Sequence, residues 1–174
     1  VYVLSLAAAV FVNSIRSNKR QQACRIGIYL PNTVSTIVAA TLWTFLFNSR
    51  NGYINKILDG IGVGRQLFLG SRSQALICVA IVGIWVVFGY NMIIFLSALK
   101  DVPSEYYEAA KIDGANAVQR FFKITLPSIK GTTIFVLVTS LIASFQAFDQ
   151  IRVMTSGGPG KTTEVTVYYL SLIH

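Results

Sequence analysis

The sequence predicts an all-α protein, a polytopic bundle of transmembrane helices with a helix–turn–helix elbow outside the membrane. Of the 174 residues, 53% are hydrophobic and only 13% are charged, whereas about a quarter of a soluble domain is charged. Residues 26–47 and 73–99 contain no Asp, Glu, Lys or Arg, and about 20 apolar residues of helix cross a bilayer. An ordinary soluble enzyme is therefore excluded.

Five apolar segments are expected to be spans of one transmembrane domain, residues 1–174. They show no strand-like alternation and no charged stripe, so helices are the only structure that satisfies their backbone in lipid. Pro31 is expected to bend the second span, and residues 53–58 to form a short interfacial helix closed by glycines. Because the sequence begins and ends inside apolar segments, we expect a fragment truncated at both ends. The expected spans are 1–15, 26–47, 73–99, 131–149 and 164–174.

The loops between these segments carry the basic residues. The first loop, which includes Arg16, and the third loop together hold nine Lys and Arg, against six in the second and fourth. Basic residues accumulate on the cytoplasmic side of membrane proteins, so the first loop and the loop 100–130 are predicted to be cytoplasmic. Membrane topology therefore accounts for the net charge of +8, since the basic residues lie in the loops between apolar segments. The lipid bilayer is an expected partner, and nucleic acid is not.

The third loop contains the signals of two short helices joined by a turn. Pro103 suits the start of the first helix, where its missing N–H costs no hydrogen bond. Gly114 suits the position after a helix end that requires positive φ, and Asn116 can cap the second helix. Leu126-Pro127 is expected to stop that helix. The loop is thus predicted to form an elbow.

Two uses of the elbow remain open from the residues alone. Ala109 and Ala110 are small enough to bring the first helix close to another surface, and Glu108 offers a charge to a basic partner. Such a helix can lie in a groove of a cytoplasmic protein. The alternative is an elbow that rests on the lipid surface.

A sequence motif in the elbow resembles a known family. Glu108-Ala109-Ala110, three residues, Gly114, nine residues, Ile124, one residue and Leu126-Pro127 match the EAA loop of permeases from binding-protein-dependent ABC importers. Residues 99–127, 144–149 and 155–159 are similar to the carbohydrate branch of that family. Within the branch they resemble most the maltose-permease first-subunit and glycerol-3-phosphate permease type.

The resemblance implies a type I ABC importer permease core in a bacterial plasma (inner) membrane. The chain would correspond to the second to sixth helices of a six-helix core. Its implied activity is to move a sugar or related solute, of the oligosaccharide or glycerol-3-phosphate class, into the cytoplasm by alternating access. Implied partners are a cytoplasmic ABC ATPase dimer, a second related permease subunit that completes a heterodimer, and an extracytoplasmic solute-binding protein. The implied ATPase-coupling residues are Glu108, Ala109, Ala110 and Gly114.

Polar residues within the predicted spans are candidates for a solute path. Polar groups at membrane depth face protein or water, but interhelical hydrogen bonding with small-residue packing is the favoured explanation. An ion-coupled secondary transporter is the alternative function. It would need an ionisable group near the membrane centre, whereas the one candidate acid lies near the outer end of the fourth span. The candidate path residues are Asn91, Ser140, Ser144, Gln146 and Asp149.

No catalytic or metal-binding constellation can be assembled from the sequence. The only histidine is the last residue, His174. The glycine-rich segment 157–162 lacks the first glycine of a phosphate-binding loop, because position 155 is Thr. We therefore expect no enzyme activity and no bound cofactor in this chain. A separate ATPase would bind ATP and Mg²⁺ and hydrolyse the nucleotide.

Overall fold

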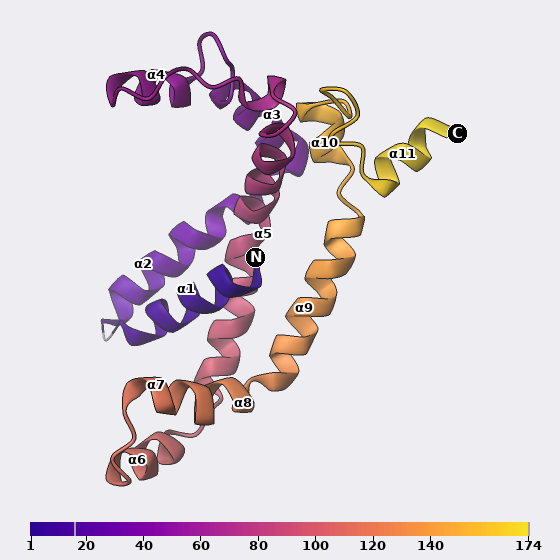
Figure 1. The fold of residues 1–174 in the computed structure, drawn as a ribbon. Helices are drawn as coiled ribbons and strands as arrows, with labels where there is room; N and C mark the ends of the chain where they lie inside the picture. The colour runs from indigo at the N-terminus through magenta and orange to yellow at the C-terminus, as the bar shows by residue number, and fades with distance from the viewer. Residues whose placement is uncertain (16, 174) are drawn as a thin grey trace. The chain divides into compact units, whose positions relative to one another are not determined.

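The computed structural model describes residues 1–15 and 17–173, so Arg16 and His174 lie outside the described residues. Within those ranges every regular element is a helix, which confirms the all-α prediction (Figure 1). The chain divides into two compact units. The first comprises Val1–Leu30 and Phe88–Leu141, and the second comprises Pro31–Val87 and Ile142–His174.

The first unit is built on apolar helices that pack around small residues. It contains α1 (Tyr2–Ser14), α2 (Asn18–Tyr29), α5 (Ala75–Lys100) from Phe88 onward and α9 (Lys130–Phe145) up to Leu141. A Cβ added at Gly89 of α5 would overlap the carbonyl oxygen of Ile28, so the α2 backbone contacts α5 directly. The buried core consists of Leu6, Ala9, Val12, Met92, Phe95, Leu96, Leu99, Ile129 and Val136.

The elbow also belongs to the first unit. It comprises α6 (Ser104–Ile112), α7 (Ala117–Arg120), the π-helical turn η3 (Phe121–Thr125) and α8 (Leu126–Ser128). The predicted start and turn are confirmed: Pro103 is the N-cap of α6, and Gly114 has a φ of +74°. Asn116 and Gln119 form a capping box at the start of α7, which confirms the predicted cap.

The end of the elbow differs from the prediction. Leu126-Pro127 does not stop the second helical arm, which continues to Ser128 and bends by 71° before α9. Pro127 falls in the first turn of α8, where its missing N–H is tolerated. The preceding turn widens to the π-helical η3, and this wider hydrogen-bond spacing accommodates a proline within a continuing helix.

The second unit packs short helices around a separate core. It contains α3 (Thr36–Leu46), α4 (Tyr53–Gly60), α5 up to Val87, α10 (Asp149–Met154) and α11 (Thr166–Ile173), with 3₁₀ turns η1 (Leu30–Thr33) and η2 (Phe68–Gly70). The short helix predicted at 53–58 is observed as α4. The buried core consists of Ala40, Phe47, Cys78, Val79, Val82, Ile151, Met154 and Tyr168.

By length and apolar composition, α5 is the one described helix that could cross a membrane by itself. Two bent pairs raise the number to as many as three: Asn18–Thr33 with Thr36–Leu46, and Ala117–Ser128 with Lys130–Phe145. The expected second span is interrupted because Pro31 lies in η1. The number of membrane crossings, and the treatment of 1–174 as a single domain, stay predictions.

Candidate functional site

The first arm of the elbow, α6, is a short helix with complementary charges at its ends. Glu105 lies in its first turn and Lys111 in its last, which suits the positive and negative ends of the helix dipole. After Asp113, the positive φ of Gly114 reverses the chain toward the second arm. Nothing lies within 4 Å of a Cβ built at Gly114, so the glycine is required by backbone conformation and not by crowding.

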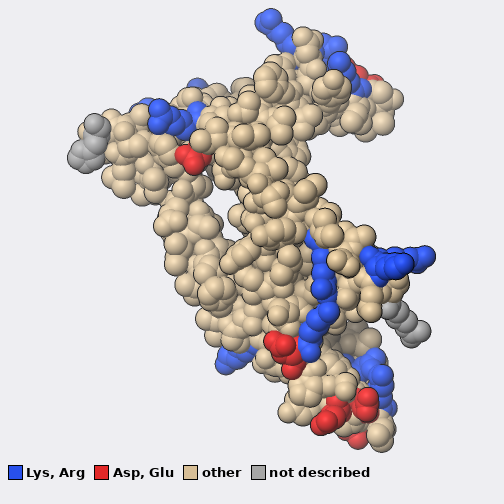
Figure 2. Space-filling view, turned by 180° about the vertical axis from the view of Figure 1, so that it is seen from behind, with Lys and Arg blue, Asp and Glu red and all other residues tan. Residues whose placement is uncertain are grey.

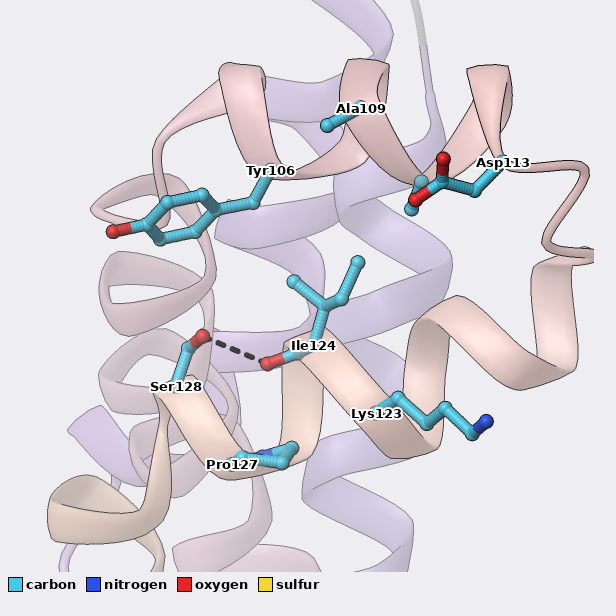
Figure 3. A pocket seen from close by; sticks show the side chains of 8 residues that line it. Tyr106, Ala109, Asp113, Lys123, Ile124, Pro127 and Ser128 are labelled. Carbon is cyan, nitrogen blue, oxygen red and sulfur yellow. Dashed lines mark hydrogen bonds between the residues drawn. The ribbon is translucent and has the colours of Figure 1, made fainter.

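A groove of about 400 Å³ lies between the two arms (Figure 3). The lining residues of α6 follow the spacing i, i+3, i+4 and i+7, which defines one face of a helix. Two of these residues are alanines, whose short side chains project little into the groove. The Ile124 side chain points toward α6 from the second arm. The full lining is Tyr106, Ala109, Ala110, Asp113, Lys123, Ile124, Pro127 and Ser128.

The second arm keeps its shape through side-chain hydrogen bonds to its own backbone. The Thr125 hydroxyl donates to the Arg120 carbonyl at 3.4 Å, across the widened turn of η3. The Ser128 hydroxyl donates to the Ile124 carbonyl at 2.7 Å, as the dashed line in Figure 3 marks. These bonds satisfy carbonyls near the proline, which lacks an N–H.

The opposite face of the elbow is attached to the core of the first unit. The Tyr107 hydroxyl lies 2.9 Å from Thr125 Oγ1, so α6 is hydrogen-bonded to η3, and Thr125 is buried. Phe121 and Leu126 pack against the core. The groove therefore opens outward while the residues behind it connect both arms to the body of the unit.

Charge on the elbow is mixed (Figure 2 shows red and blue side chains there together). Asp113 on one wall of the groove and Lys123 on the other are both exposed. Glu108 is also exposed and lies outside the groove lining. An apolar floor with separated charges at its edges suits a protein partner better than a small neutral molecule.

The structure brings two of the four predicted coupling residues, Ala109 and Ala110, into the groove. Gly114 instead shapes the turn, and Glu108 occupies an adjacent exposed face of α6. The sequence did not single out Lys123 and Ser128 as site residues. Tyr106 and Asp113 could have been found from their helical spacing to the two alanines.

The candidate path residues fall in different units. Asn91 is buried, and its Nδ2 donates to Ser140 Oγ at 3.3 Å, which joins α5 to α9 within the first unit. Ser144, Gln146 and Asp149 belong to the second unit, where all three are exposed. The helix α9 ends at Phe145, so the expected span 131–149 is not helical throughout. The role of the five residues stays a prediction.

Acidic, histidine and cysteine side chains do not gather into a metal-binding site among the described residues. Throughout 1–15 and 17–173, no group of three or more His, Cys, Asp or Glu is placed to hold a metal ion. The side-chain hydrogen bonds described at the elbow cap its helices, bond to helix carbonyls or join its two arms. The elbow groove is therefore the candidate functional site, and its surface is suited to docking.

The chain belongs to the family described as the binding-protein-dependent transport system inner membrane component, whose model matches residues 2–170. This confirms the family that the elbow motif indicated. The elbow motif lies within the matched region.

Curated relatives in bacteria share this similarity. A probable ABC transporter permease protein, YurN, of Bacillus subtilis is 35% identical over 148 residues, which is 84% of this chain and 51% of the relative. The sn-glycerol-3-phosphate transport system permease protein UgpA of Yersinia enterocolitica is 38% identical over 168 residues, covering 95% of this chain and 56% of the relative. The chain thus spans about half the length of these relatives.

Solved structures show the same fold. A chain of a bacterial ABC transporter involved in the import of the acidic polysaccharide alginate aligns with a TM-score of 0.89 and 26% identity, over 99% of this chain and 60% of that chain. A second structure shows a bacterial alginate ABC transporter with an alginate pentasaccharide-bound periplasmic protein. It aligns with a TM-score of 0.87 and 27% identity, over 99% of this chain and 61% of that chain.

Proposed function

We propose that the chain is the membrane-spanning permease subunit of an ATP-driven, binding-protein-dependent ABC importer in a bacterial inner membrane. The observation that carries this proposal is the family match over residues 2–170, which includes the whole elbow. The chain performs no bond chemistry itself. A separate cytoplasmic ATPase dimer binds ATP and Mg²⁺ and supplies the energy.

The elbow is the part that receives the ATPase in this proposal. Its groove, lined by Ala109 and Ala110, lets a partner approach the α6 backbone closely, and Glu108 on the neighbouring face pairs with a basic residue. Movement of α6 passes to η3 through the bond between Tyr107 and Thr125. From η3 it reaches the core through Phe121. The elbow thus has a continuous physical connection to the helices that rearrange during alternating access.

The proposed solute is a sugar or a related compound of the oligosaccharide or glycerol-3-phosphate class. Support comes from the names of the relatives, which include a glycerol-3-phosphate permease and an alginate importer. A second related permease completes the solute path, and an extracytoplasmic binding protein delivers the solute. An ion-coupled secondary transporter gains no support from the family match.

The test is reconstitution of the full-length permease with its proposed partners, the ATPase, the second permease and the binding protein. ATP hydrolysis in proteoliposomes should rise several-fold when the binding protein carries its solute, and labelled solute should accumulate inside. Uptake that continues without an ATPase, driven by an ion gradient, would overturn the proposal. A panel of oligosaccharides and glycerol-3-phosphate then identifies the solute.

A further inference from the structure

The first unit contains a cluster of positive charge without a carboxylate partner. Arg25 Nη2 of α2 donates to Gln21 Oε1 at 3.0 Å, and Lys100 Nζ, at the end of α5, donates to the same oxygen at 3.5 Å. Two cations thereby share one neutral acceptor. Such an arrangement is unfavourable unless a negative charge lies nearby.

The cluster also contains an unfilled hydrogen-bond donor. Arg25 Nε is buried and has no hydrogen-bond partner, although buried polar atoms are nearly always paired. Asp101 follows Lys100 in the sequence, yet the one ion pair among residues 1–15 and 17–173 joins Arg65 to Asp59. A half-buried guanidinium beside an exposed ammonium group matches the oxygens of a phosphate.

The surrounding elements place the cluster where an apolar region ends. Lys100 is the last residue of α5, the helix that is long and apolar enough to cross a membrane. Arg25 directly precedes the charge-free segment 26–47. Gln21 Nε2 donates to the Val12 carbonyl, near the end of the apolar helix α1. Ends of apolar helices lie at the level of lipid headgroups, where basic side chains meet acidic lipids.

We propose that Arg25, Gln21 and Lys100 form a binding site for the phosphate headgroup of an acidic phospholipid. The headgroup phosphate contacts the exposed Lys100 ammonium and the accessible part of the half-buried Arg25 guanidinium, while Gln21 keeps both side chains in place. The inference rests on these contacts and is independent of the solute that the protein carries. It assigns to α2 and α5 a contact with lipid that helps to fix both helices at the membrane surface.

The test measures spin-labelled phosphatidylglycerol, relative to labelled phosphatidylcholine, bound to the full-length protein in liposomes. Each basic residue near an anionic surface changes lipid affinity about fivefold. The double variant Arg25→Gln/Lys100→Gln should therefore lose most of the preference for phosphatidylglycerol, and Arg25→Lys should retain part of it. The matched control Arg50→Gln/Lys56→Gln removes the same charge from the other basic loop and should leave the preference unchanged.

Two results would overturn the proposal. Equal phosphatidylglycerol preference in the double variant and the wild type would show that the cluster does not bind the headgroup. Displacement of the labelled lipid by millimolar inorganic phosphate would assign the cluster to a soluble anion and not to a lipid. The single variant Lys100→Gln changes only an exposed side chain, so its partial loss of preference remains measurable if the double variant folds poorly.

Discussion

At the scale of single residues, Gly114 determines the direction of the elbow's second arm. Its φ of +74° lies in the left-handed region, which costs a residue with a Cβ roughly 1–2 kcal/mol. No neighbouring atom lies within 4 Å of a Cβ at this position, so the cost is purely one of backbone conformation. The effect of a substitution at Gly114 therefore depends on how well the new residue tolerates positive φ.

Replacement of Gly114 should test this backbone requirement. Gly114→Val is expected to distort the turn, because a β-branched residue resists positive φ. Solute-stimulated ATP hydrolysis by the assembled transporter should fall about tenfold. Gly114→Asn is the matched control, since asparagine tolerates the left-handed region, and should retain most of the activity. Equal activity of the two variants would contradict the role given to the turn.

Glu108 offers a second test at the residue scale. Its side chain is exposed and outside the groove, so Glu108→Lys should leave the thermal unfolding of the permease unchanged. If the carboxylate pairs with the ATPase, the reversed charge should weaken co-purification of the ATPase by tenfold or more. Glu105→Lys, one turn earlier on the same helix, is the control. A similar loss in both variants would indicate general electrostatics and not a specific pair.

At the scale of elements, the two arms of the elbow are joined by one side-chain hydrogen bond. The Tyr107 hydroxyl and Thr125 Oγ1 lie 2.9 Å apart, and Thr125 is buried. A double-mutant cycle of Tyr107→Phe and Thr125→Ala should give a coupling free energy of about 0.5–1.5 kcal/mol in unfolding experiments. Both single variants should also reduce solute-stimulated ATP hydrolysis. A coupling energy near zero would show that the arms are held by packing alone.

The short helix α4 depends on one buried amide. Asn55 Nδ2 donates to the carbonyls of Ser49 and Gln66, and Asn55 Oδ1 accepts the Gln66 N–H. Asn55→Ala should therefore release α4 at a cost of about 1–3 kcal/mol, because the partner groups lose their bonds. Hydrogen exchange over 53–60 should accelerate. Asn51→Ala changes an exposed side chain nearby and should leave exchange unaffected.

Local signals account for the elements that could be predicted from the sequence. The start of α6, the turn at Gly114 and the cap at Asn116 each depend on a residue and its immediate neighbours, and all three are observed. The bend of the second span at Pro31 was likewise predicted from the proline, and the two helices on either side meet at 95°, although hydropathy alone is the same for a straight and an interrupted helix. The groove was not predicted, because it forms where one arm of the elbow packs against the other and no local sequence pattern specifies that packing.

At the scale of the whole molecule, the polar residues of the predicted spans belong to two different units. Asn91 and Ser140 bond to each other within the first unit. Ser144, Gln146 and Asp149 lie in the second unit. A shared role in a solute path, predicted for a helix over 131–149, meets the finding that α9 ends at Phe145. Thiol accessibility in the assembled transporter tests whether these residues meet water.

Cysteine accessibility separates a solute path from a dry packing seam. In a background with Cys24 and Cys78 replaced by Ala, the variants Ser140→Cys, Ser144→Cys and Gln146→Cys should react with a water-soluble thiol reagent if they line the path. Bound solute should slow that reaction severalfold at all three positions. The hydrogen bond between Asn91 and Ser140 instead favours a seam at that depth, because such bonds commonly join helices in lipid.

The nucleotide state makes this accessibility test decisive. A path that opens alternately to each side should change its reactivity between the resting transporter and the ATP-bound transporter, since only one side admits the reagent at a time. Leu137→Cys, on an exposed apolar part of α9, is the control and should react equally slowly in both states. Unreactive cysteines at all three positions in both states would leave interhelical packing as the role of these residues.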